Sequence, residues 1–300
     1  MVGLHTLLRL KNFPDISVRA VVHSKKPWVK AENISYVKAD LTKINDCRRV
    51  VYGMDYVLMF AAKIDRRSSG LDPVLQTLMI NSQMLEAAYQ ASIKKFLWLS
   101  SAVAYPVYEG LLTEGLMFEG NPHDSYFALG WTTRYIEKLC ETYALKLKRT
   151  MQTVVLRPTA IYGPWGDFDY ATSHVLPALI RRVVERQNPL EIWGTGETRR
   201  DFIYVDDVVD ACLLALERVS PFGAFNVGAG RSYSVKELLQ VILDTERYME
   251  AVVVFDPSKP VKAPSIAVDC SKANEYFGFE AKTSLREGIE KTIAWLKEAR

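Results

Sequence analysis

The sequence predicts an α/β fold: a doubly wound parallel sheet of the Rossmann type, with a smaller C-terminal lobe. Short, almost continuously apolar runs alternate with segments of helical periodicity through the first half of the chain, which is typical of parallel strands covered on both faces. The 300 residues are 49% hydrophobic and 24% charged, as expected for an ordinary folded domain. After Gly163 the loops lengthen, so we expect a sheet domain at 1–163, completed by strands from the later half, and the smaller lobe at 164–300.

Five apolar runs in the first half are predicted as strands, at 18–23, 34–40, 56–62, 95–101 and from Met151 onward. Helical periodicity fills the intervals, at 4–12, 41–53, 71–92 and 131–148. Near the C-terminus, Ser284 is followed three residues later by Glu287, the spacing of a capping box at the start of a last helix.

The start of the chain departs from the usual order of such a sheet. A doubly wound nucleotide-binding sheet opens with a strand and a glycine-rich turn before its first helix. Here helical periodicity begins almost at Met1, and Gly3 alone stands where the last glycine of that turn would be. Losing a central strand would leave unpaired backbone groups in the sheet. We therefore expect a truncated start, with genuine loss of the first strand and glycine-rich turn as the alternative.

Charge and cysteine usage exclude several classes of protein. The 38 basic and 35 acidic residues give a net charge of +3, too small for a nucleic-acid-binding surface. The four cysteines lie far apart without a CxxC pair, so we expect no metal site and a reducing, cytoplasmic location. No run of 18 apolar residues occurs, and we expect no membrane span.

Six segments in order resemble the motifs of extended short-chain dehydrogenases/reductases, the nucleotide-sugar epimerase/dehydratase family. They are FAAKID, LWLSSAVAYP, LRPTAIYGP, SHVLPALIRR with WGTGETRRDF, ETRRDFIYVDDVVDA and FNVGAG. Within that family the fourth is closest to GDP-fucose synthases. The resemblance spans nearly the whole chain and implies an NAD(P)-dependent epimerase, reductase or dehydratase. Its dinucleotide would lie on 1–163, and its nucleotide-diphosphate sugar mainly on the substrate-binding lobe at 164–300.

The residues that end the predicted strands are candidates for binding the dinucleotide. The run His23, Ser24 and Lys25 carries no acid, which favours NADP, with NAD as the alternative, because an acid there would bind the ribose hydroxyl of NAD. A solvated lysine turn would look the same. Asp40 could accept a hydrogen bond from adenine or cap the next helix.

Small side chains at Ala61 and Ala62 would let a flat cofactor approach the backbone, although close strand–helix packing also favours alanine. The resemblance completes the cofactor-binding set with Gly3, Leu41, Lys63, Pro158 and Ile161.

The catalytic positions depart from the family pattern, which uses a serine and a Tyr-x-x-x-Lys dyad. Ser101 matches the serine. Aligning GWTTRYIE on its glutamate places Leu129 at the tyrosine position and Thr133 at the lysine position. Leucine cannot exchange a proton, and threonine carries no charge that would bind ribose or lower a tyrosine pKa. Tyr126 lies one turn upstream, but its i+4 residue is Gly130.

Two interpretations therefore stay open: an enzyme with altered chemistry, or a catalytically inactive sugar-nucleotide-binding or regulatory subunit. Val103 and Ala160 stand where GDP-fucose synthases carry cysteine and asparagine. By the same resemblance His174 is retained and could supply a proton. The nucleotide-diphosphate contacts would be Arg182, Trp193 and Arg200, although a solvated helix face and a core aromatic are alternatives for the first two.

Two further expectations concern carboxylates and assembly. We interpret Asp206 and Asp207 as helix caps rather than metal ligands. The helices at 74–89 and 130–147 carry more apolar residues than one sheet face needs, and the family pairs through these helices, so we expect a homodimer. The residues concerned are Leu75, Leu78, Met79, Leu85, Tyr135, Leu139 and Tyr143.

Overall fold

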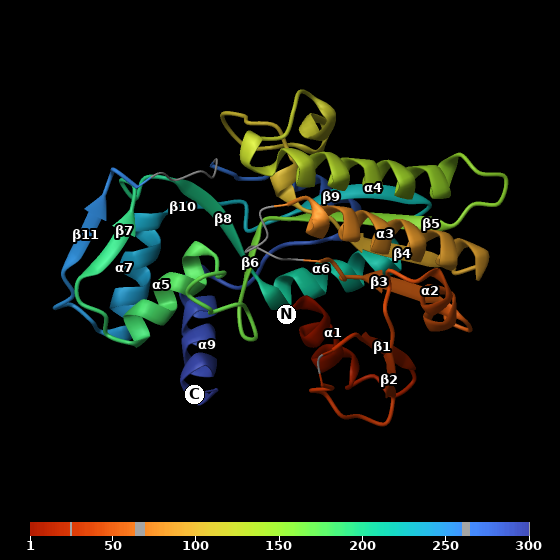
Figure 1. The fold of residues 1–300 in the computed structure, drawn as a ribbon, viewed down its shortest axis with the longest axis horizontal. Helices are drawn as coiled ribbons and strands as arrows, with labels where there is room; N and C mark the ends of the chain where they lie inside the picture. Colours follow the sequence, from red (N-terminus) through yellow and green to blue (C-terminus); the bar gives the residue numbers. More distant parts are fainter. Residues whose placement is uncertain (25, 64–69, 260–264, 300) are drawn as a thin grey trace.

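Two parallel sheets form the framework of the computed structural model, which describes residues 1–24, 26–63, 70–259 and 265–299 (Figure 1). One pairs β1 (Val18–Val22) with β2 (Ile34–Lys38). The other has the order β3-β4-β5-β9, with β3 (Tyr56–Met59), β4 (Lys95–Leu99), β5 (Gln152–Pro158) and β9 (Phe222–Val227).

All five predicted strands are confirmed, and β9 returns from the later half of the chain as expected. The described strands form two separate parallel sheets, because no pairing joins β1 to β3. The framework is an α/β fold with parallel strands, divided at this point.

Helices cover both faces of this framework. On one face α1 (Val2–Leu10) lies against α6 (Val205–Arg218). On the other, α2 (Ile44–Val51), α3 (Asp72–Gln90) and α4 (Phe127–Leu145) lie in a row. The strands are apolar on both sides because each face is buried: Leu97 contributes to the core under α6, and Phe96 to the core under α3 and α4.

The later half of the chain adds a lobe that shares its core with the α6 face of the sheet. Its strands are β6 (Ala160–Tyr162), β8 (Arg199–Tyr204) and β10 (Ser232–Ser234) in one sheet, and β7 (Leu190–Trp193) with β11 (Val253–Asp256) in another. Its helices are α5 (Val175–Val184), α7 (Val235–Glu246), α8 (Ser271–Phe277) and α9 (Leu285–Glu298). Within the described ranges, no helix has the length and apolar character needed to cross a bilayer.

Two serines begin helices of this lobe. Ser284 caps α9 as predicted, its hydroxyl accepting a hydrogen bond from the Glu287 amide at 3.2 Å. A reciprocal capping box, which the sequence analysis missed, begins α7: Ser234 accepts from the Glu237 amide, and the Glu237 carboxylate accepts from the Ser234 amide. The signal was present, since these residues have the same Ser-x-x-Glu spacing.

Candidate functional site

The predicted cofactor residues gather at the carboxyl ends of the parallel strands, where ligands of open α/β sheets bind. Val22 pairs with Lys38, so His23 and Ser24 after β1 lie beside Asp40 and Leu41 after β2. Lys25 falls outside the described residues. This edge therefore carries the Asp40 carboxylate, with Asp46 of α2 accepting a hydrogen bond from the Asp40 amide at 2.8 Å, and no acid at the end of β1.

Asp40 forms a local turn rather than a helix cap. Its Oδ1 accepts hydrogen bonds from the Thr42 amide at 3.1 Å and the Thr42 hydroxyl at 2.7 Å. These bonds lower the pKa of the Asp40 carboxyl, so the group stays charged. The alternative that Asp40 caps the next helix is wrong, because Lys43 is the N-cap of α2.

The turn after β3 is open to solvent and anchored from α3. Ala61 and Ala62 are exposed, which contradicts the alternative that they pack closely against a helix. The hydroxyl of Thr77 accepts a hydrogen bond from the Lys63 amide at 3.1 Å and lies 3.2 Å from the Lys63 carbonyl. Thr77 thereby fixes the backbone against which a flat ligand would lie.

Ser101 lies two residues after the end of β4 and is the N-cap of η1, where its hydroxyl accepts a hydrogen bond from the Val103 amide at 3.3 Å. The following turn, η1 (Ala102–Ala104), is held against α4. Arg134 of α4 donates to the Ala104 carbonyl at 2.9 Å. A methyl group at Gly130 would lie 2.5 Å from Pro122 and 3.5 Å from the Ala104 backbone. Only glycine therefore lets α4 approach the serine turn this closely.

The two dyad positions lie on this closely packed part of α4. Thr133 is 6% exposed and Leu129 is 36% exposed. Tyr126 lies in η3 (Asp124–Tyr126), just before α4 begins, and its ring centre is 6.3 Å from that of His123. Neither Leu129 nor Thr133 offers a titratable group, so α4 presents no proton donor at these positions.

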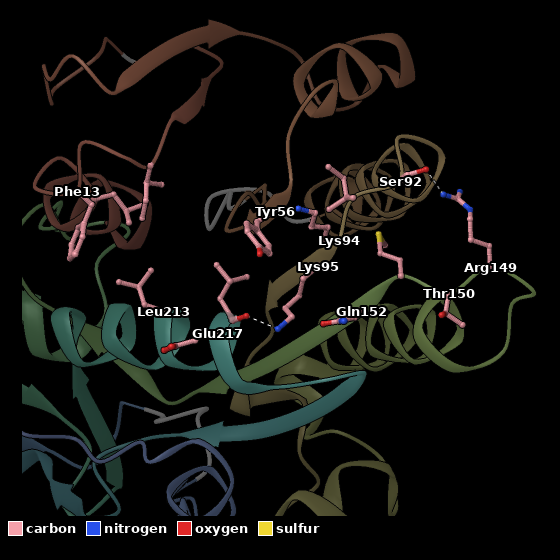
Figure 2. A pocket seen from close by; sticks show the side chains of 15 residues that line it. Phe13, Tyr56, Ser92, Lys94, Lys95, Arg149, Thr150, Gln152, Leu213 and Glu217 are labelled. Atoms are coloured by element: carbon pink, nitrogen blue, oxygen red, sulfur yellow. Dashed lines mark hydrogen bonds between the residues drawn. The ribbon is translucent and has the colours of Figure 1, made fainter.

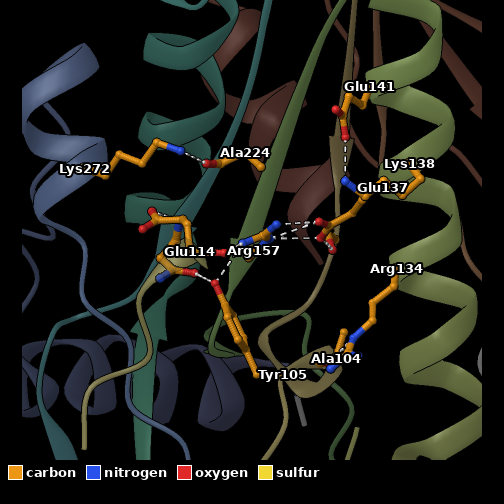
Figure 3. Close-up of polar contacts among 12 residues, drawn as sticks. Ala104, Tyr105, Glu114, Arg134, Glu137, Lys138, Glu141, Arg157, Ala224 and Lys272 are labelled. Atoms are coloured by element: carbon orange, nitrogen blue, oxygen red, sulfur yellow. Dashed lines mark hydrogen bonds and ion pairs between the residues drawn. The ribbon is translucent and has the colours of Figure 1, made fainter. Parts of the chain in front are cut away.

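A buried polar network, missed by the sequence analysis, connects the serine strand to α4 (Figure 3). The Arg157 guanidinium contacts both Glu137 carboxylate oxygens, with Nη2 to Oε2 at 2.6 Å. Ser100 donates to Glu137 Oε1 at 2.6 Å, and Arg157 donates to the Tyr105 hydroxyl at 2.9 Å. The two charged side chains are 2–3% exposed, and burial raises the pKa of Tyr105 well above its usual range.

This network anchors α4 to the serine strand. Charged pairs are buried only when their hydrogen bonds are satisfied. Both residues stand in motifs that the sequence shows: Glu137 ends GWTTRYIE, and Arg157 is the arginine of LRPTAIYGP. These motifs were the signals from which the pair could have been suspected.

The predicted substrate residues lie on the C-terminal lobe. His174 is the exposed N-cap of α5. Arg182 donates to the Glu191 carbonyl at 2.7 Å, which brings it next to β7 and rules out a purely solvated side chain. Trp193 ends β7 and is 57% exposed, so the core-aromatic alternative is wrong. Arg200 lies on β8, opposite Tyr233.

The two aspartates at the start of α6 bind distant segments of the chain and do not cap the helix. Asp206 pairs with His5 of α1 at 2.6 Å. Asp207 accepts hydrogen bonds from the backbone amides of Lys282 and Thr283. The N-cap of α6 is Tyr204. In the described part of the chain, no cluster of three histidine, cysteine or acidic side chains is placed to hold a metal ion.

A nicotinamide dinucleotide fits these residues in part. The strand ends at His23, Asp40 and Ala61 offer an open edge for the adenosine half. Gly3 lies in the first turn of α1, where a methyl group would be 3.6 Å from the Phe60 ring that follows β3. In the predicted alignment Thr133 occupies the lysine position, and its side chain offers no charge to a nicotinamide ribose.

Comparison with known proteins agrees with this arrangement of motifs. The model of the "NAD dependent epimerase/dehydratase family" matches residues 1–228. GDP-L-fucose synthase of Escherichia coli K12 is 32% identical over 265 residues, covering 82% of this chain and 81% of that protein. GDP-L-fucose synthase 1 of Arabidopsis thaliana is 31% identical over 255 residues, covering 80% of this chain and 76% of that protein.

Solved structures show the same fold over the full length. UDP-glucose 4-epimerase of Thermotoga maritima, solved with UDP-glucose, superposes with a TM-score of 0.85 at 25% identity. The match covers 100% of this chain and 96% of that one. MoeE5, solved with UDP-glucuronic acid and NAD, superposes with a TM-score of 0.84 at 24% identity, covering 100% and 96% of the two chains. The chain belongs to the NAD-dependent epimerase/dehydratase family of extended short-chain dehydrogenases/reductases.

Proposed function

We propose that this protein binds a nucleoside-diphosphate sugar between its parallel sheet and C-terminal lobe, and that Tyr–Lys proton transfer is absent from it. The observation that carries the proposal is the pair Leu129 and Thr133 on α4, beside an intact serine turn. Neither side chain can exchange a proton with a sugar hydroxyl or place a positive charge on a ribose. The surrounding framework is closely packed at Gly130 and holds the buried Arg157–Glu137 pair.

The lobe supports the binding half of the proposal. Trp193 presents an exposed ring for stacking on a base or sugar. Arg182 lies beside the same strand, and Arg200 on β8 offers a planar fork suited to diphosphate oxygens. These three side chains supply stacking and anion recognition without the dyad. The cofactor preference is NADP over NAD, because no acid follows β1.

A second candidate is an active epimerase, reductase or dehydratase that uses another acid. Tyr126 favours it, because this phenol lies just ahead of α4 beside His123. His174 at the start of α5 is the alternative donor, and Ser101 would polarise the sugar oxygen.

Titration calorimetry with GDP- and UDP-sugars tests binding directly. Trp193→Ala should weaken binding about 5- to 150-fold, since a stacked aromatic contributes on the order of 1–3 kcal/mol. Trp28→Ala is the matched control, because Trp28 is 70% exposed and lies outside the lobe. Equal affinities for both variants and the unaltered protein would contradict the placement of the ligand.

Hydride transfer, followed by nicotinamide absorbance, tests the chemistry. Leu129→Tyr with Thr133→Lys should raise turnover by ~10²–10⁴ and more than either single change, because the lysine tunes the tyrosine. Thr132→Lys adds the same charge one residue away and should have no such effect. If the unaltered protein turns over at ~1–10³ per second, the non-catalytic proposal fails, and Tyr126 and His174 are the residues to substitute next.

A further inference from the structure

A cavity of about 1040 Å³ lies at the amino ends of β3, β4 and β5, at the opposite end of the sheet from the predicted cofactor residues (Figure 2). Its lining includes the first residue of each strand: Tyr56, Lys95 and Gln152. Tyr56 pairs in register with Lys95, and Lys95 with Gln152. Side chains at paired positions project from the same face of a sheet, so the phenol, the ammonium and the amide form one row.

Lys95 places a nearly buried positive charge in the middle of this row. The residue is 5% exposed, and its Nζ donates to the Leu216 carbonyl in the last turn of α6 at 2.6 Å. The partial negative charge at the end of that helix offsets part of the cost of burial. An ammonium has three N–H donors, and this carbonyl accepts from only one of them. Burial accordingly lowers the pKa of Lys95.

The carboxylates near the cavity do not balance this charge. Asp55, which precedes β3, pairs with Lys94 at 2.7 Å. Glu217 lines the cavity, but its side chain is 74% exposed and lies 3.8 Å from Arg218. Within the described part of the chain, no carboxylate oxygen lies within 4 Å of the Lys95 ammonium. A buried charge is costly unless a partner offsets it, so an anion in the cavity would stabilise this arrangement.

Apolar side chains lie beside the polar row. Ile93 and Met151, which precede β4 and β5, and Leu213 of α6 all line the cavity. Its volume is ample for a small organic molecule. Figure 2 shows the Gln152 amide turned towards the Lys95 ammonium. The cavity thus combines two adjacent hydrogen-bonding groups with apolar walls, which suits a ligand with one charged end.

The geometry points to a binding site for an organic carboxylate at the amino ends of β3, β4 and β5. The carboxylate accepts hydrogen bonds from the Lys95 ammonium and the Gln152 amide, and the apolar part of the ligand lies against Leu213. The ligand then supplies the counter-charge that the chain itself does not. This site is at the far end of the sheet from the proposed sugar-nucleotide site, and the inference does not depend on that proposal.

Titration calorimetry of the complete chain with sodium octanoate tests the site. Acetate has the charge without the apolar part, and octan-1-ol has the apolar part without the charge, so both should bind at least about tenfold more weakly. Lys95→Met should weaken octanoate binding about 10- to 150-fold, because it removes a hydrogen bond to a charged group. Lys94→Met is the matched control: it removes the same charge one residue away, where Asp55 already pairs with it, and should leave the affinity within about twofold.

Gln152→Glu tests the missing counter-charge without disturbing the bond between Lys95 and Leu216. The new carboxylate would stand beside the ammonium in register. It should raise the thermal midpoint of unfolding and abolish octanoate binding, whereas Lys95→Met should abolish binding without raising the midpoint. Octanoate affinity that is equal in the unaltered protein and in Gln152→Glu, with circular dichroism showing both folded, would overturn the inference. So would the absence of octanoate binding to the unaltered protein at millimolar concentration.

Discussion

Removing the charge of Glu137 should destabilise the protein severely, although the substitution changes no side-chain volume. Glu137→Gln leaves the Arg157 guanidinium, 3% exposed, without a counter-charge. It also places an amide donor against Arg157 or against the Ser100 hydroxyl, both of which now donate to the carboxylate at 2.6 Å. Breaking a buried pair of this kind costs about 3–5 kcal/mol, which corresponds to a fall in Tm on the order of 10 °C.

Glu141→Gln is the matched control for this prediction. Glu141 lies one turn further along α4 and pairs with Lys138 at 2.8 Å on the exposed side of the helix. Such a pair is worth about 0.2–1 kcal/mol. Urea unfolding followed by circular dichroism should therefore separate the two variants clearly. In the double variant Glu137→Gln with Arg157→Met, most of the lost stability should return, because no buried charge remains unpaired. If Glu137→Gln unfolds within about 1 kcal/mol of the unaltered protein, the network does not anchor α4.

The remaining predictions concern pH, assembly and cofactor. Burial raises the pKa of Asp201 to about 6, above its value in the unfolded chain. The contribution of this carboxyl to the free energy of unfolding is therefore greatest near pH 4 and is lost as pH rises to 6. The urea midpoint should fall over this pH range, and Asp201→Asn should reduce that fall. Leu75→Glu with Tyr135→Glu, at positions 57% and 56% exposed, should convert a homodimer into a 34.0 kDa monomer, whereas Tyr52→Glu should not. Light scattering that shows only monomer for the unaltered protein refutes this. Fluorescence titration should show weaker binding of NADPH and NADH than in the Thr133→Lys variant, because threonine offers no charge to the nicotinamide ribose; equal binding would contradict that account.

The apolar residues from which we expect a dimer fall into two groups, those exposed to solvent and those buried in the core. Leu75, Met79 and Tyr135 are exposed on α3 and α4, as a docking face requires. Leu85 is fully buried, so it belongs to the core of this chain and not to an interface. Periodicity places all of these residues on helices, but the neighbouring elements decide which of them stay accessible.

The sequence by itself determined the local elements and the side-chain chemistry available at Leu129 and Thr133. Alternation of apolar strands with helices is a local pattern, so strands such as β4 and β5 could be assigned from it. The identities of Leu129 and Thr133 exclude proton transfer at those positions without reference to any contact. Ser284 was assigned as a cap because its partner lies only three residues away.

Only the tertiary structure decided how distant segments meet. Arg157 and Glu137 are 20 residues apart in sequence, and no local pattern indicates that they form one buried pair with Ser100. The absence of pairing between β1 and β3 among the described residues likewise depends on where distant strands lie. The physical reason is the same in each case: pairing and burial are set by neighbours in space, whereas propensity and side-chain chemistry are carried by the residue itself.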